Sequence, residues 1–142
     1  MVMEVKRMRI ILILNQTKVR MKTNYNRPKV IAEIGCNHKG EIEIAKQLLR
    51  VAAESGVEVA KFQKRNNKEL LAKEQYNAPH PNPINSYGDT YGAHREFLEF
   101  NVNQHKELKE YAESLGLVYS TSVWDTTSAK EIVTLNPELI KI

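Results

Sequence analysis

Three charged side chains stand within short apolar segments whose residue types are typical of buried strands. They are Glu33, Lys61 and Lys141, our candidate catalytic residues, and each has apolar neighbours on both sides. An unpaired ion is very costly in an apolar environment, so each must be paired or must bind a ligand. Two converging lysines would hold a phosphate or carboxylate, while Glu33 would accept sugar hydroxyls or transfer a proton. The alternative is an internal ion pair, for example between Glu33 and Lys61.

Further polar side chains end the same segments or open the turns that follow them. A long loop, residues 77–92, would lie at the same edge, and loops of this length in compact domains are commonly functional lids. Its tyrosines and Trp124 would stack against a sugar face, or would simply anchor the loop. The candidate substrate-binding residues are Asn37, His38, Gln63, Tyr87, Tyr91, Ser120, Ser122 and Asp125.

Short apolar runs alternate with amphipathic helical patterns along the chain. Such alternation favours a parallel sheet with right-handed crossovers, in which ligands bind beyond the carboxyl ends of the strands. Ile142 lies inside the last apolar run, with no helix after it. We therefore expect an α/β fold of parallel βαβ units, the first half of a TIM (β/α)₈ barrel truncated after strand 4, rather than a complete four-stranded domain. The expected strands are residues 29–35, 57–63, 117–124 and 138–142, and the expected helices are residues 41–55, 94–100, 103–115 and 126–135.

The positive charge is concentrated at the N-terminus. Residues 1–29 carry eight Lys and Arg against one Glu, a balance of +7, and the other thirteen basic and sixteen acidic residues give −3. The body of the protein therefore lacks the basic surface of a nucleic-acid-binding domain. We divide the chain into a basic, poorly ordered arm, residues 1–27, and a half-barrel, residues 28–142. Binding of the arm to nucleic acid or to an anionic membrane surface is the alternative.

Composition also bears on location and metal chemistry. The longest apolar stretch, residues 10–14, is far shorter than the roughly 20 residues of a membrane-spanning helix. The single cysteine, Cys36, cannot form an internal disulfide, which is typical of a reducing compartment, so we expect a cytoplasmic protein. The four histidines lack metal-ligand spacing, so we expect no metal site in this chain. His105 lies in a helical pattern and is expected to be solvated.

Four short motifs follow one another along the chain. They are AEIGCNHKG at residues 32–40, VAKFQ at residues 59–63, YSTSVWD at residues 119–125 and LIKI at residues 139–142. In this order they resemble the sialic acid synthase family, which includes N-acetylneuraminate synthases and legionaminate-type synthases. The resemblance covers residues 28–142 and implies the N-terminal half of a synthase barrel.

The resemblance implies condensation of phosphoenolpyruvate with an N-acylated amino sugar such as N-acetylmannosamine, which gives a nine-carbon keto sugar acid and phosphate. It implies that Glu33 binds the sugar and that Lys61 and Lys141 hold phosphoenolpyruvate. It also implies Mn²⁺ or Mg²⁺, held by residues that the family carries on later strands, and a homodimer. The alternative is a non-catalytic half-barrel that binds an anionic metabolite or pairs with another chain.

Overall fold

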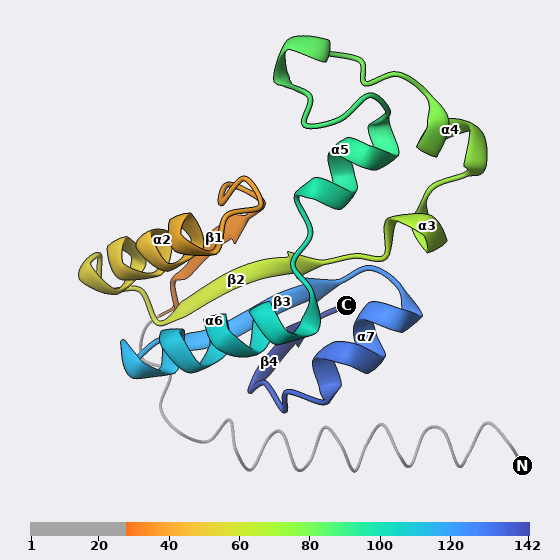
Figure 1. Cartoon of the computed structure of the whole chain (residues 1–142). Helices are drawn as coiled ribbons and strands as arrows, with labels where there is room; N and C mark the ends of the chain where they lie inside the picture. Colours follow the sequence, from red (N-terminus) through yellow and green to blue (C-terminus); the bar gives the residue numbers. More distant parts are fainter. Residues whose placement is uncertain (1–27) are drawn as a thin grey trace, which may run out of the picture.

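The computed structural model describes residues 28–142, and the predicted N-terminal arm lies outside the described residues. Within them, four parallel strands form one sheet in the order β1-β2-β3-β4 (Figure 1). The predicted α/β fold with parallel βαβ units is confirmed. The strands are β1 (Ile31–Gly35), β2 (Val59–Lys64), β3 (Val118–Val123) and β4 (Leu139–Lys141).

Three longer helices connect or follow these strands, and each lies within three residues of its predicted bounds. Helix α2 buries Ala45, Leu49 and Ala52, whose spacings of four and three place them on one side of the helix. None of the helices in residues 28–142 has the length and apolar character needed to cross a membrane. The longer helices are α2 (Ile42–Glu54), α6 (Val102–Ser114) and α7 (Thr126–Val133).

The side chains of the sheet alternate between two faces. Ala60, Phe62 and Tyr119 belong to the hydrophobic core, together with buried residues of α2 and α6. Figure 1 shows these two helices on the same side of the sheet. Successive side chains of a strand point to opposite faces, so Lys61, between Ala60 and Phe62, points away from this helical layer.

His105 lies inside this core, and the prediction that it is solvated is wrong. Its side chain is fully buried, and its Nδ1 atom lies 2.7 Å from the hydroxyl oxygen of Tyr119. The rings of Phe62 and Phe100 meet the His105 ring edge to face. Burial lowers the pKa of His105 to about 3. His105 lies three residues before buried Leu108 and therefore on the buried side of α6. The prediction of a solvated His105 overlooked this spacing.

The connection between β2 and α6 contains three short helices that the sequence pattern does not predict. The fourth helix of this connection begins at Tyr91 rather than at residue 94, because the Thr90 side chain caps it by accepting a hydrogen bond from the backbone N–H of Ala93. Figure 1 shows the whole connection extending beyond the carboxyl end of β2. Its elements are α3 (Asn67–Leu70), α4 (Lys73–Asn77), η1 (Pro83–Asn85) and α5 (Tyr91–Phe97).

Candidate active site

The register of the sheet places six polar side chains on its non-helical face. Aligned residues of neighbouring parallel strands share a face, and so do residues two apart in one strand. Two adjacent rows result, and each runs across the strands. The second row lies two residues closer to the carboxyl ends of the strands, where this class of fold binds ligands. The first row is Glu33, Lys61 and Ser120, and the second is Gln63, Ser122 and Lys141.

Lys61 joins the two rows. Its ammonium group forms an ion pair with the carboxylate of Glu33 and donates a hydrogen bond to Ser122 Oγ at 3.3 Å. The internal ion pair considered from the sequence is therefore present. The Lys61 side chain is only 11% exposed, whereas that of Glu33 is 52% exposed. A carboxylate so exposed is well solvated and exchanges partners at little cost, so the pair is compatible with ligand binding.

Lys141 supplies a second cation to the same face. It is exposed, and it forms no ion pair or hydrogen bond with another described residue. Lys141 is aligned in the sheet with Ser122, whose hydroxyl accepts a hydrogen bond from Lys61, so both lysines neighbour this serine on one face. Two ammonium groups and a hydroxyl form a suitable binding surface for a phosphate or a carboxylate.

Gly35 makes room for this arrangement where β1 ends. Its φ of +55° lies in the left-handed region, and the register of β1 against β2 shifts between Glu33 and Gly35. A Cβ atom at this position would lie 3.3 Å from Gln63 Nε2 and 3.6 Å from Glu33 Oε1. Glycine at position 35 thus permits both the backbone turn and the close approach of two candidate site residues.

The hydrogen bonds and ring contacts of Asn37 and His38 lie within the turn after β1 and in the core, and none joins them to the six residues of the two rows. The Asn37 side chain donates to the carbonyl of Ile34 at 2.9 Å, which stabilises the turn after β1. His38 is buried, stacks on Phe100 with ring centroids 4.1 Å apart, and accepts a hydrogen bond from the Gly40 backbone through Nδ1. Burial lowers the pKa of His38 to about 4. This placement gives His38 a packing role and does not support its predicted contact with substrate.

Asp125 also has a structural role. It accepts hydrogen bonds from the backbone N–H of Ser128 at 2.6 Å and from the backbone N–H of Asn66 at 2.7 Å. Partial burial opposes ionisation, but these hydrogen bonds lower the pKa of Asp125 overall. Asp125 thereby caps α7 and fixes the chain that leaves β2. Ser120, in contrast, keeps a fully buried hydroxyl with no hydrogen-bond partner among the described residues.

The two predicted tyrosines use their rings within the long connection. Tyr87 stacks almost parallel on Phe97, with centroids 4.7 Å apart, and Tyr91 lies 5.7 Å from the guanidinium of Arg95. His94 continues the stack and accepts a hydrogen bond from the Tyr87 backbone N–H. These contacts favour the loop-anchoring interpretation, and none joins the tyrosines to the two rows.

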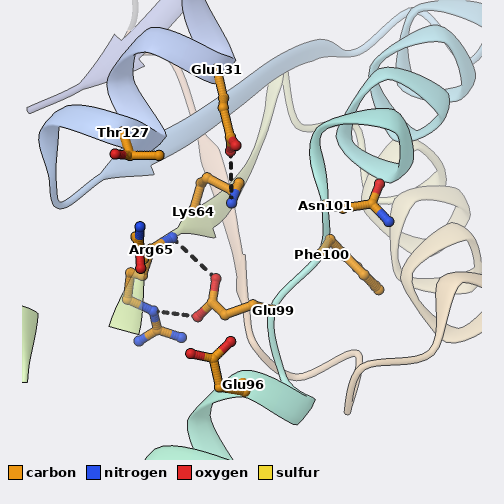
Figure 2. A pocket seen from close by; sticks show the side chains of 9 residues that line it. Lys64, Arg65, Glu96, Glu99, Phe100, Asn101, Thr127 and Glu131 are labelled. Atoms are coloured by element: carbon orange, nitrogen blue, oxygen red, sulfur yellow. Dashed lines mark hydrogen bonds and ion pairs between the residues drawn. The ribbon is translucent and has the colours of Figure 1, made fainter. Parts of the chain in front are cut away.

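A pocket of about 250 Å³ lies on the helical side of the sheet, between the end of β2, the start of α6 and α7 (Figure 2). Its two cations are already neutralised. Lys64 pairs with Glu131 at 3.0 Å, and buried Arg65 pairs with buried Glu99 at 2.6 Å. Sequence reasoning missed the Arg65–Glu99 pair, since its two members are 34 residues apart. The pocket therefore offers an anion less free positive charge than the opposite face does.

The metal ion that the resemblance implies does not fit the described residues. No group of three or more His, Cys, Asp or Glu side chains within residues 28–142 is arranged to hold a metal ion. Divalent cations such as Mg²⁺ prefer several oxygen ligands, and the two rows are dominated by amines, hydroxyls and an amide. No chemical step is therefore assigned to a metal.

Curated relatives share the sequence pattern over most of this chain. N-acetylneuraminate-9-phosphate synthase from Mus musculus is 37% identical over 113 residues, which are 80% of this chain and 31% of that protein. N,N'-diacetyllegionaminic acid synthase from Campylobacter jejuni is 28% identical over 113 residues, 80% of this chain and 34% of that protein. The chain thus spans about a third of the length of these relatives.

Solved structures share the fold. N-acetylneuraminic acid synthetase from Leptospira borgpetersenii, crystallised with citrate, superposes with a TM-score of 0.64 at 23% identity, over 82% of this chain and 36% of that one. Spore coat polysaccharide biosynthesis protein SpsE from Bacillus subtilis gives a TM-score of 0.54 at 24% identity, over 79% of this chain and 28% of that one. The fold is thus part of a TIM-type barrel. Residues 48–142 match the family model described as the NeuB family, and the chain belongs to that family.

Proposed function

We propose that this chain carries the phosphoenolpyruvate-binding part of a sialic acid synthase active site. One observation carries the proposal: Glu33, Lys61, Ser122 and Lys141 share one face near the carboxyl ends of parallel strands. Phosphoenolpyruvate carries a phosphate and a carboxylate, which two amines and a hydroxyl would neutralise and bind. The relatives in Mus musculus and Campylobacter jejuni are named for products with N-acetyl groups, which supports an N-acylated amino sugar as the second substrate.

The proposed reaction makes one carbon–carbon bond. The terminal enol carbon of phosphoenolpyruvate bonds to the aldehyde carbon of the open-chain sugar, and the aldehyde oxygen takes up a proton. A water molecule supplies the remaining oxygen, inorganic phosphate departs, and a nine-carbon 2-keto acid results. Negative charge gathers on the departing phosphate, so fixed ammonium groups beside it lower the barrier by electrostatic stabilisation.

Each residue has a role that follows from its contacts. Lys61 is held in place by Glu33 and Ser122, so its ammonium group is pre-oriented for the anion. Lys141 has no such partner and would bind the second anionic group. Glu33 is half exposed beside these cations, which suits it to accept hydroxyl hydrogen bonds from the sugar.

Isothermal titration of the 142-residue chain with phosphoenolpyruvate tests the proposal. We expect saturable binding that Lys61→Met and Lys141→Met each weaken at least tenfold, about 1.4 kcal/mol. Lys106→Met is the matched control, because Lys106 is an exposed lysine of α6, away from the two rows. Equal affinity in all four proteins would contradict the proposal. Binding without phosphate release after N-acetylmannosamine and Mn²⁺ are added would favour the non-catalytic, anion-binding alternative.

A further inference from the structure

Trp124 is an aromatic side chain without a partner at the edge of the proposed site. It follows the last residue of β3 and is 57% exposed. No ring contact, hydrogen bond or cation contact joins it to another described residue. The tyrosines of the long connection differ in this respect, because Tyr87 is stacked on Phe97 and Tyr91 lies beside Arg95. Of the three predicted aromatic residues, Trp124 is therefore the one whose ring remains free to contact a ligand.

The backbone indicates the face to which Trp124 belongs. Ser122 points to the face of the two rows, where it accepts a hydrogen bond from Lys61. Asp125 points the other way, because its side chain caps α7. Val123, the residue between Ser122 and Trp124, still belongs to β3, so the alternation of the strand reaches Trp124. Trp124 thus follows Ser122 on the same face, about 7 Å further toward the carboxyl edge.

The flat side of an indole ring binds C–H groups. The six side chains of the two rows are charged or polar and are suited to ionic groups and hydroxyls. Among the substrates proposed above, the N-acyl amino sugar carries one distinct apolar group, its acyl methyl. We propose that Trp124 is a specificity-determining residue that packs against the N-acyl group of the sugar. This inference rests on the proposed function. It predicts selection for acylated over non-acylated sugars, and it does not concern phosphoenolpyruvate.

The sequence offers a direct readout, because Trp124 is its single tryptophan. Its emission is recorded while N-acetylmannosamine is added to the 142-residue chain in the presence of saturating phosphoenolpyruvate. We expect a saturable shift of the emission to shorter wavelength, since the sugar removes water from the indole. Mannose is the matched control, because it carries a hydroxyl in place of the acylamino group. We expect mannose to require at least tenfold higher concentration for the same shift.

Two variants separate recognition from stability. Trp124→Ala should weaken the binding of N-acetylmannosamine about tenfold in calorimetry, while affinities for mannose and phosphoenolpyruvate stay unchanged. Trp124→Phe keeps a ring and should retain most of the affinity. The side chain is exposed, so both variants should melt within a few degrees of the parent chain.

The outcomes distinguish this inference from the function on which it rests. If phosphoenolpyruvate binds but N-acetylmannosamine leaves the emission unchanged, or mannose acts equally well, the role of Trp124 is overturned and the proposed function stands. If the parent chain binds neither ligand, both are overturned. Equal loss of mannose and N-acetylmannosamine binding in Trp124→Ala would likewise reject recognition of the acyl group.

Discussion

The carboxylate of Glu99 accepts two hydrogen bonds from Arg65, one from Nε at 2.6 Å and one from the backbone N–H at 3.1 Å. Both side chains are less than 10% exposed. Arg65 also donates to the sulfur of Cys36 at 2.7 Å. One arginine thus joins three parts of the chain: the turn after β1, the end of β2 and the segment before α6.

Removal of Glu99 should therefore be strongly destabilising. Glu99→Ala leaves a buried guanidinium without its counter-ion, and we expect the free energy of unfolding to fall by about 3–5 kcal/mol in urea denaturation. Glu110→Ala is the matched control, because its pair with Lys106 is more than 60% exposed on both sides. That variant should lose less than about 1 kcal/mol. Similar losses of unfolding free energy in the two variants would show that the buried pair stabilises the fold no more than the exposed pair does.

The hydroxyl of Tyr119 should matter more than that of another tyrosine. Tyr119→Phe removes the hydrogen-bond partner of buried His105, and we expect a loss of about 1–3 kcal/mol in the free energy of unfolding. Tyr111→Phe removes a comparable hydroxyl, which accepts from Arg50 in an exposed contact. Its loss should stay within about 0.5 kcal/mol. A smaller effect at Tyr119 than at Tyr111 would refute the importance of the buried contact.

Stability should decrease below neutral pH because of two buried histidines. The folded-state pKa is about 4 for His38 and about 3 for His105, whereas the unfolded chain titrates near 6.5. The unfolded state therefore binds more protons as pH falls below 6.5, and unfolding becomes easier. Between pH 7.5 and pH 5.5 each histidine should remove about 1.4 kcal/mol from the free energy of unfolding.

Urea denaturation at the two pH values measures this difference directly. The double variant His38→Gln, His105→Gln should be less stable at both pH values, but its stability should change much less between them. A smaller pH dependence should remain, because burial also lowers the pKa of His94. An unchanged pH difference in the double variant would assign the effect to other groups.

Gly35 and Gly56 provide a matched pair of glycines. Both have positive φ, but a Cβ at Gly35 would crowd Gln63 and Glu33, whereas a Cβ at Gly56 meets no atom within 4 Å. Alanine at either position should cost about 1–2 kcal/mol of stability through backbone strain. Only Gly35→Ala should also weaken phosphoenolpyruvate binding in calorimetry, because it displaces the partner of Lys61. Equal affinities of the two variants for phosphoenolpyruvate would show that Gly35 does not contribute to the binding site.

Local periodicity was sufficient to predict the strands, the longer helices and the shared sheet face of Glu33, Lys61 and Lys141. Each depends on the alternation of apolar and polar residues within a few positions, which the sheet register then aligns. His38 and the Arg65–Glu99 pair could not be predicted in this way. Their environments depend on residues 34 or more positions away, such as Phe100 beside His38, which only the folded chain brings close.

The strict alternation along β2 also limits how this protein can vary. A single residue inserted between Val59 and Ala60 would move every later side chain of the strand to the opposite face, so that Phe62 would leave the apolar layer and Lys61 would enter it. Length changes among natural variants should therefore be absent from this strand. They should accumulate instead near exposed Ile84, at the tip of the long connection, where an added residue disturbs neither layer.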